Sequence, residues 1–133
     1  METTLIDLTT GDRRIIDLTS EAADFVRDRG DGLLHAFAPH ATAGLALMET
    51  GASSEPDLED ALDRLLPRDD RYRHSHGSPG HGADHLLPAF VSPSISVPVL
   101  DGRLALGTWQ SLVLVDPNRD NPHRQVRFSF LAG

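Results

Sequence analysis

Histidine placement is the feature of this sequence best suited to chemistry. Four of the seven histidines, His74, His76, His81 and His85, fall within one glycine-rich stretch, and His40 lies at a junction between two apolar runs. Zinc and similar metals bind neutral imidazole nitrogen, and three protein ligands suffice when one coordination position must stay open for a substrate. The chain has no cysteine, so any metal site must rely on imidazole and carboxylate.

Spacing alone does not choose among these histidines. His74 and His76 would share one face of a strand, whereas His81 and His85 would share one face of a helix. Neither geometry can be assumed in a glycine-rich loop, and the alternative is that these side chains are exposed and inert. His35, in an apolar run, is expected to be a hydrogen-bonded core residue.

Other polar residues are candidates for binding a substrate. Glu49 ends an apolar run and is a candidate general base or metal ligand, the alternative being an exposed strand end. Trp109, the only tryptophan, is either a stacking wall with polar anchors or a core residue at a bend. Hydroxyl and guanidinium donors for an anionic group are offered by Ser94, Ser96, Arg119, Arg124 and Arg127.

The elements that must position these residues follow from periodicity and turn signals. Helices are expected after Thr19 and Ser54, which can act as their N-terminal caps. Residues 68–83 are expected to form a long loop, followed by a short helix at 85–90 whose length Pro88 limits. Strands are expected in the first half at 2–10, 13–18, 32–38 and 43–49. An antiparallel meander with an Asp101–Gly102 hairpin turn is expected at 94–99, 103–106, 110–115 and 125–131.

Length and composition limit the class of protein. With 133 residues the chain is expected to form a single domain, residues 1–133. Twenty acidic and twelve basic residues give a net charge of -8, so neither nucleic acid nor a membrane is an expected partner. No apolar run approaches the roughly 20 residues of a membrane helix, and the N-terminus lacks a basic-then-apolar leader, which favours a cytoplasmic protein.

Several blocks of the sequence resemble the YjbQ-like family, from about His40 to Arg127. The best-defined signature is a serine, alternating aliphatic residues, a turn glycine and then Gly-Thr-Trp-Gln. It reads here S-I-S-V-P-V-L-D-G-R-L-A-L-G-T-W-Q-S-L, at residues 94–112. Further blocks agree in order: His40-Ala41-Thr42-Ala43, Glu49, Glu55-Pro56-Asp57, Tyr72-Arg73-His74, Asp84-His85-Leu86 and Arg124.

The resemblance implies an α/β fold of the α+β type, with a mainly antiparallel sheet and two to three helices, assembled as a homotrimer. It implies that His40, His74 and His85 hold a divalent metal, zinc or magnesium, or else an anion, and it leaves His76 and His81 to the loop. No organic cofactor is expected. Glu49, His40 and His85 are the expected catalytic residues. A small phosphorylated metabolite would be bound by Thr42, Ser94, Thr108, Trp109, Gln110 and Arg124.

Members of the family are described as secondary thiamine-phosphate synthases, which join hydroxymethylpyrimidine diphosphate to thiazole phosphate and release pyrophosphate. A histidine-bound metal and Arg124 would stabilise the departing pyrophosphate, and Trp109 would form a wall for the pyrimidine. The chain departs from the family at Met48-Glu49-Thr50 and in the longer segment 77–82, so its substrate can differ. Two alternatives stay open: a non-catalytic module that binds a metal or a phosphorylated ligand, and a metal-dependent phosphoester hydrolase.

Overall fold

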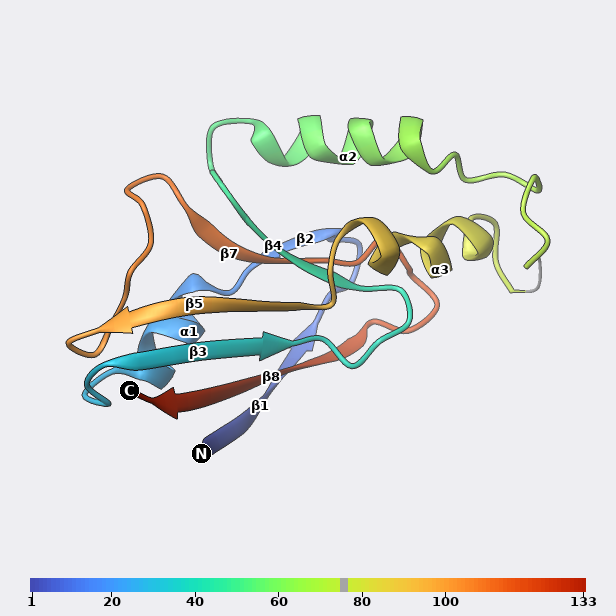
Figure 1. Ribbon diagram of the computed structural model, residues 1–133. Coiled ribbons are helices and arrows are strands. Elements are labelled where there is room, and N and C mark those ends of the chain that lie inside the picture. Colours follow the sequence, from blue (N-terminus) through green and yellow to red (C-terminus); the bar gives the residue numbers. More distant parts are fainter. Residues whose placement is uncertain (75–76) are drawn as a thin grey trace.

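The computed structural model describes residues 1–74 and 77–133. Its helices are α1 (Thr19–Val26), α2 (Ser54–Leu65) and α3 (His81–Phe90). Its strands are β1 (Glu2–Thr9), β2 (Ile15–Asp17), β3 (Gly32–Phe37), β4 (Gly44–Met48), β5 (Ser94–Leu100), β6 (Arg103–Leu104), β7 (Ser111–Val115) and β8 (His123–Ala132). This part of the chain forms one compact α+β domain (Figure 1), which confirms the predicted fold class.

The strands form two antiparallel sheets. One has the order β1-β8-β3-β5-β6 and the other has the order β2-β7-β4. The predicted meander is therefore wrong beyond the β5–β6 hairpin, because β7 joins the second sheet while β8 lies between β1 and β3 in the first. The first two strands are likewise divided: β1 pairs with β8, and β2 pairs with β7.

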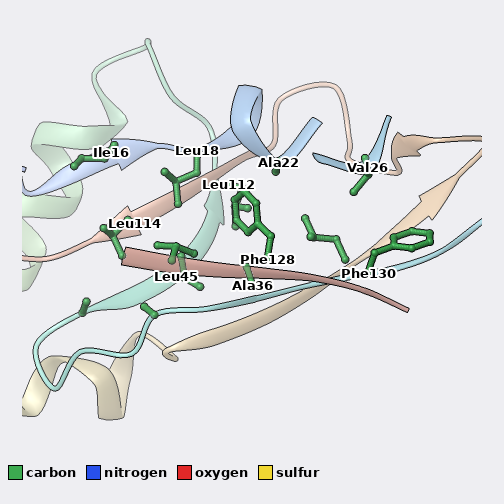
Figure 2. Close-up of a cluster of buried hydrophobic side chains, with 14 of the residues drawn as sticks. Ile16, Leu18, Ala22, Val26, Ala36, Leu45, Leu112, Leu114, Phe128 and Phe130 are labelled. Carbon is green, nitrogen blue, oxygen red and sulfur yellow. The ribbon is translucent and has the colours of Figure 1, made fainter. Parts of the chain in front are cut away.

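Strand β7 explains why the described part of the chain contains two apolar clusters. Leu112 and Leu114 face the larger core, which lies between the two sheets and α1 (Figure 2). Val113 and Val115 face the opposite way and pack with residues of α2 and α3. Successive strand residues point to opposite faces, so a strand buried on both sides needs an unbroken apolar run, and residues 112–115 supply it.

Local signals account for the turns and helix ends. Asp101 and Gly102 have φ values of 50° and 72°, so the predicted hairpin turn has the positive φ at both central residues that a type I′ turn requires. Helix α1 is not capped by Thr19. Asp17 accepts hydrogen bonds from the Thr19 amide and hydroxyl at 2.9 and 2.6 Å. The Thr19 hydroxyl oxygen accepts a bond from the Leu112 amide at 2.9 Å, which joins α1 to β7.

Helix α3 begins four residues earlier than predicted, at His81, and continues through Pro88. Gly80 precedes the helix with a φ of 87°, a conformation that glycine adopts without strain. Pro88 lies in the last turn of α3 and cannot donate a hydrogen bond to the carbonyl of Asp84, so the helix lacks that one bond. No helix among residues 1–74 and 77–133 is long and apolar enough to cross a bilayer.

Candidate functional site

Three histidines from two segments converge at the start of α3. One ligand nitrogen from each of His74, His81 and His85 lies within 4.8 Å of the others. The ring centre of His74 lies 4.9 Å from that of His81 and 4.7 Å from that of His85, and the His81 and His85 rings are 4.3 Å apart. His81 and His85 lie four residues apart on one face of the helix, whereas His74 comes from the preceding loop.

The loop is held against α3 by a close backbone contact. A β-carbon at Gly82 would lie 2.6 Å from Cβ of Tyr72 and would overlap the carbonyl oxygen of His74. The Tyr72 hydroxyl donates a hydrogen bond to the carbonyl of Pro67 at 2.7 Å, which anchors the loop beyond the end of α2. The absence of a side chain at Gly82 thus allows the loop to lie close enough for His74 to meet the helix histidines.

A carboxylate contacts the cluster from the connection between β7 and β8. Asp120 Oδ2 lies 3.3 Å from Nδ1 of His81, and its Oδ1 accepts a 2.5 Å hydrogen bond from Ser78. The pKa of Asp120 is lowered, first by the Ser78 hydrogen bond and then by His81 and Asn118, although partial desolvation opposes this. Asp120 is therefore an acceptor at neutral pH, and Nδ1 of His81 must carry the proton between them.

A buried ion pair supports the same region. Asp84 is 1% exposed and receives hydrogen bonds from the Arg68 guanidinium and, at 3.0 Å, from Asn118 Nδ2. Asn118 also accepts a bond from the Asp120 amide at 3.0 Å. Asp84 directly precedes His85 in the sequence, and Arg68 and Asn118 compensate its buried carboxylate. These contacts connect α3 to the β7–β8 connection.

His40, an expected metal ligand and catalytic residue, does not belong to this cluster. Its Nε2 accepts a hydrogen bond from the Gln125 amide at 2.9 Å and lies 3.1 Å from the Gln125 carbonyl. Gln125 lies two residues before Arg127, where the pairing of β8 with β3 ends. Burial, followed by the charge of Arg124, lowers the pKa of His40, so the imidazole is neutral at pH 7. In this chain its hydrogen bond to Gln125 extends the contact between the two segments beyond the end of the β3–β8 ladder.

Thr42 and Arg124 lie together, as expected, but they are buried. The guanidinium of Arg124 donates to Asp116 at 2.5 Å, and the Thr42 hydroxyl donates to the same carboxylate at 3.1 Å. Burial raises the pKa of Asp116, while Arg124 and the hydrogen bonds act in the opposite direction. Because both groups already bind Asp116, they hold β7, β8 and the β3–β4 connection together and offer little to a phosphate from outside.

Glu49 lies at the other end of the β4–β7 pair. Gly44 pairs with Val115 and Met48 pairs with Ser111. By this register Glu49 lies opposite residue 110, which is six residues along the chain from Asp116. At about 3.4 Å per residue this is roughly 20 Å. Figure 1 shows the end of β4 and the orange connection before β7 at the left, away from the first turn of α3 at the right. Glu49 is exposed.

The three residues before β7 share that distant end. Trp109 is 73% exposed, so it is not a core residue. The Gln110 side chain accepts a hydrogen bond from the Gly107 amide at 2.8 Å and fixes the turn that carries Thr108. Ser94 lies elsewhere again, at the start of β5 opposite Phe37. Within one chain, the expected substrate-binding residues thus do not surround the histidine cluster.

The remaining histidines have separate environments. His35 is hydrogen-bonded as expected, through Nδ1 to Ser96 Oγ at 2.9 Å, but it is half-buried and lies outside the core. His123 is exposed at the start of β8. His76, expected in the loop, lies outside the described residues.

The sequence interpretation missed two members of the site, His81 and Asp120. The i, i+4 spacing of His81 and His85 could have indicated that they share a helix face, but only if the helix had been predicted to begin by residue 81. No local signal pointed to Asp120, because it approaches His81 from 39 residues away.

Three imidazoles at this spacing are a suitable donor set for one zinc-like ion. A tetrahedral ion with bonds of about 2.1 Å places its ligand atoms about 3.4 Å apart, within the separation limit of the cluster. A hollow of about 120 Å³, lined by His74, His81, Asp69 and Asp70 among others, adjoins them. A larger hollow of about 670 Å³ lies between α1 and the β5–β6 turn, but no histidine lines it.

Fold and site together define a small antiparallel α+β protein with a histidine cluster at the start of its third helix. The chain belongs to the family described as UPF0047 protein YjbQ-like, which it matches over residues 4–133. UPF0047 protein Rv2556c of Mycobacterium tuberculosis is 62% identical over 133 residues, 100% of each chain. UPF0047 protein YugU of Bacillus subtilis is 34% identical over 131 residues, 94% of each chain.

A solved structure has the same fold. The hypothetical protein APE1520 from Aeropyrum pernix K1 superimposes with a TM-score of 0.88 and 28% sequence identity, covering 100% of each chain. The similarity establishes the family and the fold, not a reaction.

Proposed function

We propose that the protein is a metal-dependent enzyme that acts on a small phosphorylated metabolite, with His74, His81 and His85 as the metal ligands. The observation that carries the proposal is the convergence of three imidazole nitrogens within 4.8 Å. Imidazole ligands favour zinc and similar ions over magnesium, which prefers oxygen. When bound, such an ion supplies a positive charge that stabilises negative charge developing on a substrate oxygen.

The surroundings of the cluster support an anionic substrate. Arg73 directly precedes His74 and Arg119 directly precedes Asp120, and both arginines are exposed. Guanidinium groups bind phosphate oxygens with two parallel hydrogen bonds. In this proposal Arg73 and Arg119 would bind the phosphate in place of Arg124, which is engaged with Asp116.

The reaction that the family resemblance implies is thiamine-phosphate synthesis, and we propose it as the first reaction to assay. Release of pyrophosphate requires compensation of its charge, which a cationic centre with neighbouring arginines supplies. A flat pyrimidine requires an aromatic wall, and Trp109 is exposed as such a wall must be.

Trp109 and Glu49 can contribute to this site only from a second copy of the chain, because they lie at the opposite end of the β4–β7 pair. We therefore propose that the homotrimer suggested by the resemblance completes each site with residues of two copies. Mixing His81→Ala chains with Glu49→Gln chains should then restore part of the activity that each variant alone has lost. Absence of restoration in proven mixed oligomers would remove Glu49 from the site.

The central experiment measures zinc bound to the wild-type protein and to His81→Ala and His85→Ala variants, with His123→Ala as the control. The wild type and the control should bind about one ion per chain, and the cluster variants should bind at least tenfold more weakly. Full retention of metal by both cluster variants would refute the proposed ligands.

Product assays then separate the candidate activities. Pyrophosphate release from hydroxymethylpyrimidine diphosphate that requires both thiazole phosphate and metal would support the synthase. Metal-dependent release of phosphate from simple phosphoesters, without synthesis, would identify a hydrolase instead. Saturable thermal stabilisation by a phosphorylated ligand with no product would identify a binding module.

A further inference from the structure

The β7–β8 connection supplies a carboxylate, Asp120, that contacts the histidine cluster through His81. We propose that Asp120 is a positioning residue, which fixes the tautomer and the ring orientation of His81 so that Nε2 is the nitrogen directed to the ion. This inference rests on the proposed metal-binding function. It assigns a role to a residue outside the blocks on which the family resemblance was drawn.

The two oxygens of the Asp120 carboxylate contact different side chains. Oδ2 lies 3.3 Å from Nδ1 of His81, and Oδ1 accepts the hydroxyl of Ser78 at 2.5 Å. Ser78 and Asp120 are 42 residues apart, and their hydrogen bond joins the glycine-rich loop to the β7–β8 connection. The carboxylate is thus oriented by one oxygen while the other faces the imidazole.

The backbone of Asp120 is fixed by a buried neighbour. Asn118 is 5% exposed, and its side-chain oxygen accepts the Asp120 amide at 3.0 Å. Its Nδ2 donates to Asp84 at 3.0 Å and lies 3.5 Å from Asp120 Oδ2. Since Asp84 belongs to the same helix as His81 and His85, Asn118 connects the carboxylate to the helix that carries two of the ligands.

Tautomer control follows from the chemistry of the acceptor. An ionised carboxylate has no proton to donate, so the nitrogen that faces it must be protonated. A neutral imidazole protonated at Nδ1 has its lone pair at Nε2, so Nε2 is the nitrogen left to bind a metal. Loss of such an outer partner of a metal-bound histidine lowers metal affinity by about 10- to 100-fold.

The test compares Asp120→Asn with Asp60→Asn, which changes the charge equally at an exposed position of α2. Long-range proton–nitrogen NMR correlations of the metal-free proteins at pH 8 report the tautomer of His81 directly. A purely structural role of Asp120 would leave this spectrum unchanged. Zinc affinity is measured by competition with a chromophoric chelator, and thermal unfolding without metal gives stability.

Wild type and Asp60→Asn should contain His81 protonated at Nδ1 and should bind zinc equally. Asp120→Asn should shift His81 towards the Nε2-protonated form and bind zinc about 10- to 100-fold more weakly. If the His81 tautomer is unchanged in Asp120→Asn, the proposed role of Asp120 is wrong. It is also wrong if the wild type binds zinc and Asp120→Asn binds it with the same affinity. If the wild type itself binds no zinc while the tautomer responds to Asp120→Asn, the metal function fails and the control of His81 stands as a separate property.

Discussion

Replacing Gly82 with alanine tests whether the contact between the loop and α3 places His74 beside the other two imidazoles. The variant keeps all three histidines and alters only the distance between the two segments that carry them. A β-carbon at this position would lie 2.6 Å from Cβ of Tyr72 and nearer still to the His74 carbonyl oxygen, whereas ordinary contact begins at 3.4 Å, so the loop must retreat by at least about 0.8 Å. The obstructing atoms belong to the backbone and to a β-carbon, which cannot rotate away.

The size of both effects follows from that displacement. Metal ligands must lie within about 0.2 Å of their ideal distances, so a shift of about 0.8 Å should weaken zinc binding at least tenfold. Overpacking costs about 1–3 kcal/mol, and the better helix propensity of alanine offsets at most about 1 kcal/mol of it. The free energy of unfolding should therefore fall by about 0–3 kcal/mol, which leaves a domain of ordinary stability folded.

Chelator competition measures the zinc affinity, and denaturant titration measures the stability. Gly107→Ala is the matched control, because a β-carbon there meets only the flexible end of the Gln110 side chain, at 3.3 Å. It should bind zinc like the wild type. Wild-type zinc affinity in Gly82→Ala would refute the argument that the close contact at Gly82 determines the position of His74.

Three further predictions concern His40, Asp84 and Trp109. His40→Gln should retain zinc, because His40 lies outside the cluster. Since burial and Arg124 lower the pKa of His40 from 6.5, the folded wild type resists a proton that the unfolded chain accepts. Its stability should thus fall as pH drops through 6.5, less so in the variant, and denaturant titrations from pH 8 to 5 check both slopes. Asp84→Ala breaks a buried ion pair and should lower the free energy of unfolding by about 3–5 kcal/mol, against less than about 0.5 kcal/mol for Asp60→Ala. Acrylamide should quench the fluorescence of Trp109 readily in a monomer, since 73% of this residue is exposed; protection that disappears on dilution would mean that another copy covers it.

The identity of most elements could be predicted from the sequence, but their pairing could not. The apolar run in β7 predicted a strand, and the Asp101–Gly102 pair predicted the hairpin turn. Nothing in the local sequence indicates that consecutive strands alternate between two sheets, because each strand needs only an apolar face and that face can be buried in either sheet. The start of α3 was missed because Gly80 and Gly82 resemble loop residues, although one begins the helix and the other allows the close contact with Tyr72.

The histidines illustrate the same division between local and distant information. The spacing of His81 and His85 predicts that they share a face if one helix covers both, because residues i and i+4 lie on the same side of a helix. The family resemblance related His40 to His74 and His85 instead, and the structure brings the latter two together without the first. A motif records which residues occur in order along the chain, whereas the cluster depends on which segments meet.

The separation of roughly 20 Å between Glu49 and the position of Asp116 limits what one chain can do alone. No side chain reaches that far, and the stiff β4–β7 ladder between the two ends cannot close the distance without breaking its hydrogen bonds. If both ends serve one reaction, the second end must come from another copy, and activity must then depend on protein concentration below the dissociation constant of the assembly. If activity per chain is constant on dilution to monomers, the cluster, Asp120 and the neighbouring arginines are the whole site.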